Sequence, residues 1–381
     1  MAMTACLKGA HRLTWMGLVL LLVVFAGGSP NARESTCSQP AAVCQARAAV
    51  FRIAGFDPLG SAVRISETEL VTARHVVADH KIVDLFLDDG SKISADVVPT
   101  AYGGDLILLK SNGLPAGPVL SPAEVRQGDL LYAIGADMAS GTVRAYAPGP
   151  VLLMPAAGKP LARLHHAAFN QPGNSGGALV DGHGNWVGLL VAGGEGRFEA
   201  IPATEIAVLV QESGEGFSAA SQQTGAAVRR CVIGLEKPLA PRDIMPVPAA
   251  RDLEIACLGT GNRQLYDLAA QRFGQHGDPE RAIKLFQLSL DQDPNALNSR
   301  LGLVITLHYL RRYADEVPHL RVLLADLPEN IQVLWFAVQA GARSGERDLA
   351  QTAVIRLQRL NPDMAAAAAR LLESVAPAKS Q

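Results

Sequence analysis

The sequence predicts a multi-domain protein, in which an all-β domain is followed by an all-α domain of helical repeats. Between about 45 and 212, short runs rich in Val, Ile and Leu alternate with Gly, Pro, Asp and Asn, a pattern typical of short strands joined by turns. From 261 onwards the apolar residues take a helical period and the pattern repeats. The 381 residues are enough for two domains, each with its own core.

The composition is that of a globular protein and argues against one class of function. Hydrophobic residues make up 49% of the chain and charged residues 18%, so folded domains are expected rather than disorder. The 34 Lys and Arg residues nearly balance the 36 Asp and Glu residues, and the net charge is -2. Because the chain has no basic surplus, it offers no electrostatic reason to bind nucleic acid.

Residues 1–28 have the pattern of a signal peptide. Lys8 and Arg12 precede an apolar run over 13–26, and small residues follow it. The run is shorter than the ~20 apolar residues that a spanning helix needs, so we expect cleavage and no stable membrane span afterwards. An uncleaved anchor is the alternative. The pattern predicts a secreted protein, located in the bacterial periplasm.

Four cysteines follow the predicted signal peptide, namely Cys37, Cys44, Cys231 and Cys257. An even number in an exported chain favours two disulfides. Proximity along the chain favours the pairs Cys37–Cys44 and Cys231–Cys257, although other pairings or free buried thiols remain as alternatives. None of the four belongs to a C-x-x-C or C-x-x-H pair, so no metal is expected, and no cofactor motif is present.

The first domain, predicted over 45–212, contains several runs that read as strands: 48–53, 61–65, 69–72, 82–87, 105–109, 130–134 and 186–191. Their short length and their turn-rich spacing favour a barrel or a sandwich. Residues 213–260 then change composition, first to Gly, Ser, Gln and Ala and later to several prolines. We interpret this segment as an interdomain linker, pinned by a Cys231–Cys257 bridge.

The last domain, predicted over 261–376, carries a repeat. Pro294, Pro328 and Pro362 each follow an amphipathic stretch, and they are 34 residues apart. A 34-residue period closed by a proline is the pattern of tetratricopeptide repeats. We therefore predict units at 261–294, 295–328 and 329–362, followed by a capping helix; three unrelated helical hairpins are the alternative. In the second unit, Glu316 lies where a small residue is usual.

Three separate motifs in the β domain carry residues suited to acyl transfer. A strand pattern over 70–72 leads into His75, and the apolar strand over 106–109 is preceded directly by Asp105. A carboxylate next to an apolar strand is costly to bury unless a donor such as an imidazole N–H pairs with it. Taken alone, His75 could be a structural histidine and Asp105 a turn residue.

The third motif, Gly173-Asn174-Ser175-Gly176-Gly177, is the most specific of the three. Glycines on both sides of a serine let the backbone approach a substrate and adopt unusual φ and ψ values. Backbone N–H groups beside the serine could then stabilise an oxyanion. A glycine-rich hairpin is the alternative for this motif alone. The order His75, Asp105, Ser175 is that of chymotrypsin-type enzymes rather than of subtilisins or α/β-hydrolases.

Over about 48–210 the chain resembles the Deg/HtrA-type trypsin-like serine proteases. The resemblance rests on these segments: Gly60-Ser61, Val71–Val77, Asp105–Leu109, Gly128-Asp129 with Ala133–Gly135, Gly173–Leu179, and Val187–Leu189 before Ala200–Pro202. It implies a double-barrel, chymotrypsin-like fold. It also implies a serine endopeptidase, with His75 as general base, Asp105 as its orienter and Ser175 as nucleophile. The N–H groups of Gly173, Asn174 and Ser175 would form the oxyanion hole.

Two further expectations follow from this resemblance. Phe169, Val191 and Ala192 would line the specificity pocket, and their apolar character predicts a small or medium aliphatic residue before the scissile bond. Family members usually carry PDZ domains after the protease, whereas this chain carries helical repeats. Such repeats form concave surfaces, so we expect the repeat domain to dock a substrate or a protein partner, or to drive homo-oligomerisation.

Two other functional classes stay open at this point. The chain could be a catalytically inactive protease-fold scaffold, or a chaperone-like peptide-binding protein in which proteolysis is secondary. The presence of all three residues together with the glycines favours the enzyme.

Overall fold

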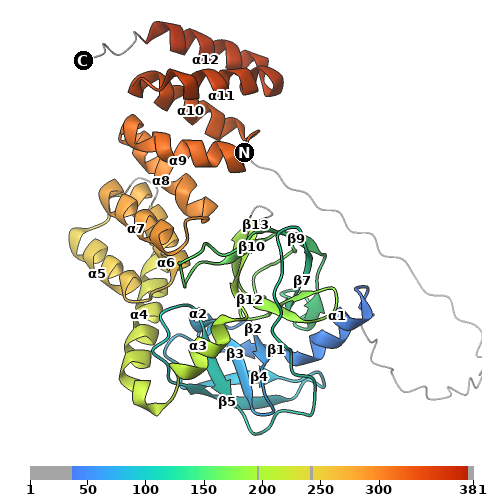
Figure 1. The fold of residues 1–381 in the computed structure, drawn as a ribbon. Helices are drawn as coiled ribbons and strands as arrows, with labels where there is room; N and C mark the ends of the chain where they lie inside the picture. The colour runs from blue at the N-terminus through green and yellow to red at the C-terminus, as the bar shows by residue number, and fades with distance from the viewer. Residues whose placement is uncertain (1–36, 195–196, 241–242, 376–381) are drawn as a thin grey trace, which may run out of the picture. The chain divides into compact units, whose positions relative to one another are not determined.

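The computed structural model describes residues 37–194, 197–240 and 243–375. Within these residues an all-β region is followed by a stack of helices (Figure 1). The predicted signal peptide lies outside the described residues. Among the helices that the model describes, none is both long and apolar enough to cross a membrane.

The first β-barrel is closed and antiparallel, in the order β1-β2-β3-β6-β5-β4. Its strands have the following bounds: β1 Val50–Ala54, β2 Gly60–Arg64, β3 Glu69–Thr72, β4 Ile82–Phe86, β5 Lys92–Val98 and β6 Ile107–Lys110. Apolar side chains such as Ile53, Leu70 and Leu109 are fully buried. Branched residues suit these strands because they pack well on a pleated surface.

The second barrel closes through the pairing of β11 with β7, and β8 is attached to the side of β7. Its strands have the following bounds: β7 Leu130–Ala136, β8 Val143–Ala145, β9 Gly149–Leu153, β10 Leu164–His166, β11 Ala178–Asp181, β12 Trp186–Gly194 and β13 Arg197–Pro202. The two closed barrels confirm the predicted double-barrel, chymotrypsin-like architecture. Closure leaves few free strand edges, which protects both barrels from edge-to-edge pairing.

Short helical segments surround the barrels: α1 Ala41–Ala46, η1 Arg47–Ala49, α2 Arg74–Val77, α3 Glu205–Gln211 and η2 Glu215–Phe217. A disulfide between Cys37 and Cys44 ties the start of the described chain to α1. Of these segments, α2 carries His75, three residues after the end of β3.

The segment 213–260 differs from the expected linker, because most of it is helical. It forms α4 Ser218–Glu236 and α5 Val247–Leu258, which the Cys231–Cys257 disulfide joins. Val228, Leu253 and the two cysteines are buried in one core with α6 and α7. The prolines do not prevent this fold, since Pro248 lies in the first turn of α5, where a missing N–H costs nothing.

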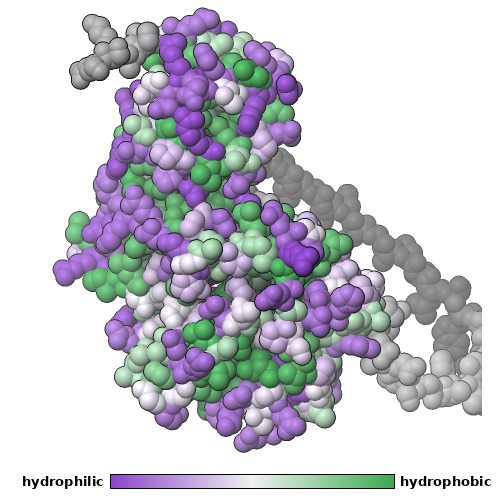
Figure 2. Space-filling model, in the orientation of Figure 1, coloured by the Kyte–Doolittle hydropathy of each residue, from purple (hydrophilic) through white to green (hydrophobic). Residues whose placement is uncertain are grey.

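Seven further helices follow, and each predicted unit contains two of them: α6 Arg263–Gln275 and α7 Pro279–Gln292, α8 Leu297–Tyr309 and α9 Tyr313–Asp326, α10 Ile331–Ser344 and α11 Arg347–Leu360, with α12 Pro362–Ser374 at the end. The helices stack in chain order (Figure 1). A predominantly hydrophilic surface covers the α10–α12 end, whereas apolar side chains reach the surface near α7 and α8 (Figure 2).

Buried charged groups join the second barrel to the helices. Glu199 of β13 accepts hydrogen bonds from Arg163, at 3.0 Å, and from Arg263 of α6. His165 of β10 bonds Asp293 through its Nε2, at 2.9 Å. All five side chains are at most one tenth exposed. Because buried charges are stable only when they are paired, these contacts fix the start of the helical stack against the barrel.

Candidate active site

His75 and Asp105 are brought together by strand pairing. β3 ends at Thr72, which is opposite Ile107 of β6, so His75, three residues after Thr72, and Asp105, two residues before Ile107, lie close together. The Asp105 carboxylate uses both of its oxygens on His75. Oδ1 accepts the backbone N–H of His75 at 2.9 Å, and Oδ2 lies 2.6 Å from Nδ1 of the imidazole. Asp105 therefore fixes both the position and the orientation of the ring.

The electrostatics of this pair favour the ionised carboxylate. Burial alone would lower the pKa of His75, but the charge and hydrogen bond of Asp105 outweigh it, and the pKa of His75 is raised above 6.5. Burial alone would raise the pKa of Asp105, but His75 outweighs it, and the pKa of Asp105 is lowered. A buried Asp⁻ beside a basic imidazole is the arrangement that a general base needs.

Ser175 lies in the loop between β10 and β11, and close contacts hold that loop against the first barrel. The backbone N–H of Ser61 in β2 donates to the Ser175 carbonyl at 2.8 Å. Gly176 has φ +84°, and a Cβ there would lie 2.1 Å from the Ser61 carbonyl oxygen. Only glycine fits this approach of two backbones. The glycine after Ser175 is therefore what allows this serine to reach the junction of the barrels.

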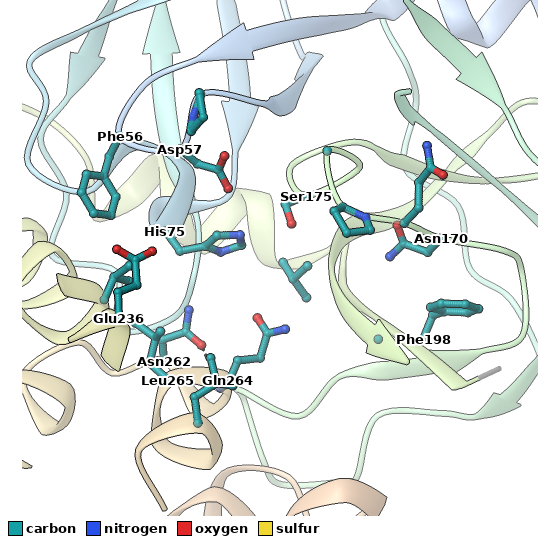
Figure 3. Close-up of a pocket in the computed structure, with 18 of the residues that line it drawn as sticks. Phe56, Asp57, His75, Asn170, Ser175, Phe198, Glu236, Asn262, Gln264 and Leu265 are labelled. Atoms are coloured by element: carbon teal, nitrogen blue, oxygen red, sulfur yellow. Dashed lines mark hydrogen bonds between the residues drawn. The ribbon is translucent and has the colours of Figure 1, made fainter. Parts of the chain in front are cut away.

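Ser175 and His75 face the same cavity from opposite sides (Figure 3). The structure describes both side chains and has no hydrogen bond between the Ser175 hydroxyl and the imidazole. The cavity has a volume of about 1050 Å³. The three predicted residues are thus brought together, with Asp105 bound behind His75 and Ser175 across the cavity from it.

The backbone N–H groups around Ser175 differ in their availability. The N–H of Asn174 donates to the Gln171 carbonyl at 3.0 Å, so the expectation that Asn174 contributes to the oxyanion hole is corrected. Within the described part of the chain, the N–H groups of Gly173 and Ser175 have no hydrogen-bond partner. The Ser61 hydroxyl donates to the Gly173 carbonyl at 2.8 Å, which fixes the peptide that follows Gly173.

Aromatic side chains line the cavity on the far side of Ser175 from His75. Phe169 and Phe198 have ring centroids 6.2 Å apart in an edge-on arrangement, and Val191 lines the cavity beside them. Gly193 is tightly packed against Phe198, since a Cβ on Gly193 would lie 2.2 Å from that ring. Ala192 lies between Val191 and Gly193 in β12 and pairs with Glu199. This end of the cavity suits an apolar side chain.

The opposite end of the cavity is formed by helices. We call this surface the helical wall, and it consists of residues from α4 and from the start of α6: Val232, Ile233, Glu236, Asn262, Gln264, Leu265 and Leu268. The lining residues from the two barrels, including His75 and Ser175, form the barrel wall. Sequence reasoning missed the helical wall and Phe198, because no local motif marks either of them. In the described residues, no cluster of three or more His, Cys, Asp and Glu side chains could hold a metal ion.

Comparison with known protein families identifies a domain in the first part of the chain. Residues 60–189, about one third of the chain, match the family described as a trypsin-like peptidase domain. No curated protein sequence matches the chain. This chain therefore carries a trypsin-like peptidase domain, and an all-helical region follows it.

The solved structures that resemble it include HtrA-type proteases. The HtrA-type protease AlgW with tripeptide is 30% identical, with a TM-score of 0.40 over 45% of this chain and 61% of that chain. The serine endoprotease from Yersinia pestis is 26% identical, with a TM-score of 0.38 over 45% of this chain and 64% of that one. The inactive form of the Rv3671c protease is 21% identical, with a TM-score of 0.41 over 47% and 98%. The chain thus spans less than two thirds of the length of the first two.

Proposed function

We propose that this protein is a serine endopeptidase that hydrolyses peptide bonds in proteins, with Ser175 as nucleophile, His75 as general base and Asp105 as the residue that orients it. The observation that carries the proposal is the double contact of Asp105 with His75, within a cavity that Ser175 also lines. A merely structural aspartate would not need to hold both the backbone and the ring of a histidine that faces a serine.

The reaction follows from this arrangement. Nε2 of His75 takes the proton of the Ser175 hydroxyl as Oγ attacks the substrate carbonyl, and His75 then gives that proton to the departing amine. Asp105 keeps the Nδ1 proton in place and stabilises the imidazolium as it forms. A water molecule, activated by His75 in the same way, releases the acyl group from Ser175. The raised pKa of His75 makes it the stronger base for both proton transfers.

Stabilisation of the oxyanion is assigned to the N–H groups of Gly173 and Ser175. Their lack of other partners in the described residues supports the assignment, because donors aimed at the developing charge must be free beforehand. We do not assign Asn174 to the oxyanion hole, because its N–H already donates to the Gln171 carbonyl.

The apolar end of the cavity supports a preference for a small or medium aliphatic residue before the scissile bond. Phe169, Val191 and Phe198 line it, and the described lining places no acidic side chain beside them. Asp57 and Glu236, the acidic residues of the described lining, are on the His75 side (Figure 3). Cleavage after Lys or Arg would need a carboxylate at the apolar end.

An exported location, in the bacterial periplasm, is part of the proposal. The two disulfides support it, since such bonds persist in oxidising compartments. The stacked helical hairpins support a tetratricopeptide-like array that docks a protein substrate or partner.

Active-site labelling tests the proposed nucleophile. A fluorophosphonate reagent should label the native chain at Ser175, as read by mass spectrometry of the labelled peptide. The Ser175→Ala variant should not react, whereas Ser140→Ala, which removes an exposed hairpin serine, should react like the native chain. A folded native chain that takes up no label would overturn the proposal in favour of an inactive scaffold.

A further inference from the structure

We propose that the helical wall is a substrate subsite that binds an apolar side chain of the second residue before the scissile bond and donates a hydrogen bond to the peptide backbone from Asn262. The inference rests on the proposed peptidase function and deepens it, since it assigns part of the cleft's specificity to the helical region. The occupant is an extended stretch of the protein substrate that is being cleaved at Ser175.

The helical wall is fixed beside His75 from both directions. On one side, Arg229 of α4 pairs with Asp79, at 2.6 Å, just after the helix that carries His75, and its guanidinium covers the Phe56 ring at 4.7 Å. On the other side, Gly261 lies so close to the segment leading to Asp105 that a Cβ there would be 2.5 Å from the Gly103 carbonyl oxygen. The wall is therefore held in place by the two segments that carry the proposed base and its orienter.

Asn262 has one polar atom that the protein leaves unpaired. Its side chain is 3% exposed, and its Oδ1 accepts the backbone N–H of Gln264 at 2.9 Å, which caps α6. Its Nδ2 is buried and has no hydrogen-bond partner within the described residues. The residue lines the cavity, and its amide lies on the side toward His75 (Figure 3). Because an unpaired buried donor is costly, a carbonyl of a bound peptide would be a favourable partner.

Apart from Glu236 and Gln264, the rest of the wall is apolar and open to the cavity. Ile233 is 45% exposed and Leu268 is 49% exposed, although both lie at the boundary with the barrels. Val232 and Leu265 lie beside them in the lining. Exposed branched side chains that adjoin a cavity offer apolar area that a ligand can cover.

The direction in which a substrate peptide crosses the cleft determines which of its residues would contact the helical wall. In an extended peptide, successive side chains point to opposite sides. When the residue before the scissile bond places its side chain between Phe169 and Phe198, the residue before it points the other way, toward His75 and the helical wall. Beyond Leu190, β12 pairs only with β13 among the described strands, so its other edge is free to pair with such a peptide.

The test uses the full-length chain and two matched pairs of variants. Ile233→Asn is compared with Ile355→Asn, because Ile355 is also an exposed isoleucine (55% against 45%) and lies on α11, away from the cleft. Asn262→Ser is compared with Asn330→Ser, because the Asn330 side chain also caps a helix, accepting the N–H of Val333 in α10, and serine keeps either cap. Two quantities are measured for each protein: the rate of fluorophosphonate labelling of Ser175, and kcat/KM for peptides that differ only at the second residue before the scissile bond.

We expect the native chain to cleave the Leu peptide at least about tenfold better than the Asp peptide. Ile233→Asn should remove most of this preference. Asn262→Ser should lower the ratio of peptide kcat/KM to labelling rate about tenfold for every extended peptide, because it removes the same backbone hydrogen bond from all of them. Ile355→Asn and Asn330→Ser should keep the native values.

The outcomes separate this inference from the function on which it rests. If the native chain takes up no label, the peptidase proposal fails. If the native chain is labelled and cleaves peptides but is indifferent to the residue at this position, or if each variant behaves like its control, the helical subsite alone is overturned.

Discussion

The barrel wall and the helical wall of the cleft differ in how their buried side-chain polar groups are paired. On the barrel wall, both oxygens of Asp105 bond His75, and the Ser61 hydroxyl holds the Gly173 carbonyl. On the helical wall, the Nδ2 of Asn262 has no partner among the described residues, and Ile233 and Leu268 are half exposed. The hydrogen bonds of the barrel wall thus fix the groups proposed for catalysis. The helical wall leaves a hydrogen-bond donor and apolar side chains available for a ligand.

The boundary between the two regions is held by buried ion pairs. The Glu199 carboxylate contacts both Arg163 and Arg263, and Arg263 also bonds Asp267 at 3.1 Å. A helical wall that was only loosely attached would not serve as a subsite. The three predictions below test, in decreasing order of effect, the chemistry of the barrel wall, the rigidity of the boundary, and the electrostatic difference between the walls.

The largest effect is expected from Asp105→Asn. An amide at this position no longer holds the Nδ1 proton of His75, so the imidazole adopts the wrong tautomer and cannot accept the proton of Ser175. We expect kcat to fall by about 10⁴-fold, as measured by steady-state cleavage of a fluorogenic peptide. The matched change Asp84→Asn, at a partly exposed aspartate of β4 that pairs with Lys92, should change kcat less than about twofold. Retention of a tenth of the native rate by Asp105→Asn would remove Asp105 from the mechanism.

The next largest effect is expected from Glu199→Gln. The substitution leaves Arg163 and Arg263 buried without their carboxylate, which is expected to lower the free energy of unfolding by about 3–5 kcal/mol in urea denaturation. Burial opposes ionisation of Glu199, but the charges of Arg263 and Arg163 outweigh it and lower its pKa to about 2. The stability that Glu199 contributes is therefore present above its ordinary pKa of 4.5 and is lost as the pH falls toward 2.

A more exposed ion pair across the same boundary provides the control for Glu199. Arg197 of β13 lies 3.8 Å from Asp326 of α9, and both side chains are partly exposed. Asp326→Asn should cost less than about 1 kcal/mol. Equal losses in the two variants would mean that the Glu199 cluster does not specifically hold the helices to the barrel.

The sequence predicted the regular parts of the fold because those parts follow local rules. Runs of branched residues placed β1 to β4, β6, β7 and β12, and the helical period predicted the helices that follow residue 261. The strands β10 and β13 were missed because they carry buried charged or titratable residues, such as His165 and Glu199, which look unlike strand-core residues. In some cases their burial depends on partners more than a hundred positions away along the chain. His165, for example, bonds Asp293. The helices α4 and α5 were missed because Gly, Ser and proline suggested a linker.

The candidate site, like the fold, could be predicted only where local sequence motifs mark its residues. His75, Asp105 and Ser175 lie in motifs whose residue types and order are specific, so the sequence alone could associate them. The position of Asn174 in the motif suggested an oxyanion donor, but the turn that carries it uses its N–H on Gln171. Phe198 and Asn262 had no motif, because their role depends on how β13 and α6 pack against the cavity.

The smallest effect is expected from Asp57→Asn and concerns the difference in charge between the walls. Asp57 lines the cavity beside His75, and its charge contributes, after that of Asp105, to raising the pKa of His75 against the opposing effect of burial. Because His75 must be neutral to accept the proton of Ser175, kcat/KM falls as the pH drops below this pKa. Removing the Asp57 charge lowers the pKa, so the acid limb moves to lower pH and kcat/KM at about pH 6 rises by about twofold relative to its plateau. Asparagine retains the oxygen that accepts the Leu59 N–H at 3.0 Å, so the loop keeps its shape.

Glu236→Gln, the matched change on the helical wall, should move the acid limb less, since Glu236 is exposed. An equal or larger shift from Glu236→Gln would show that both walls set the pKa of His75. The proposed difference between a barrel wall that carries the chemistry and a helical wall that binds substrate would then be wrong.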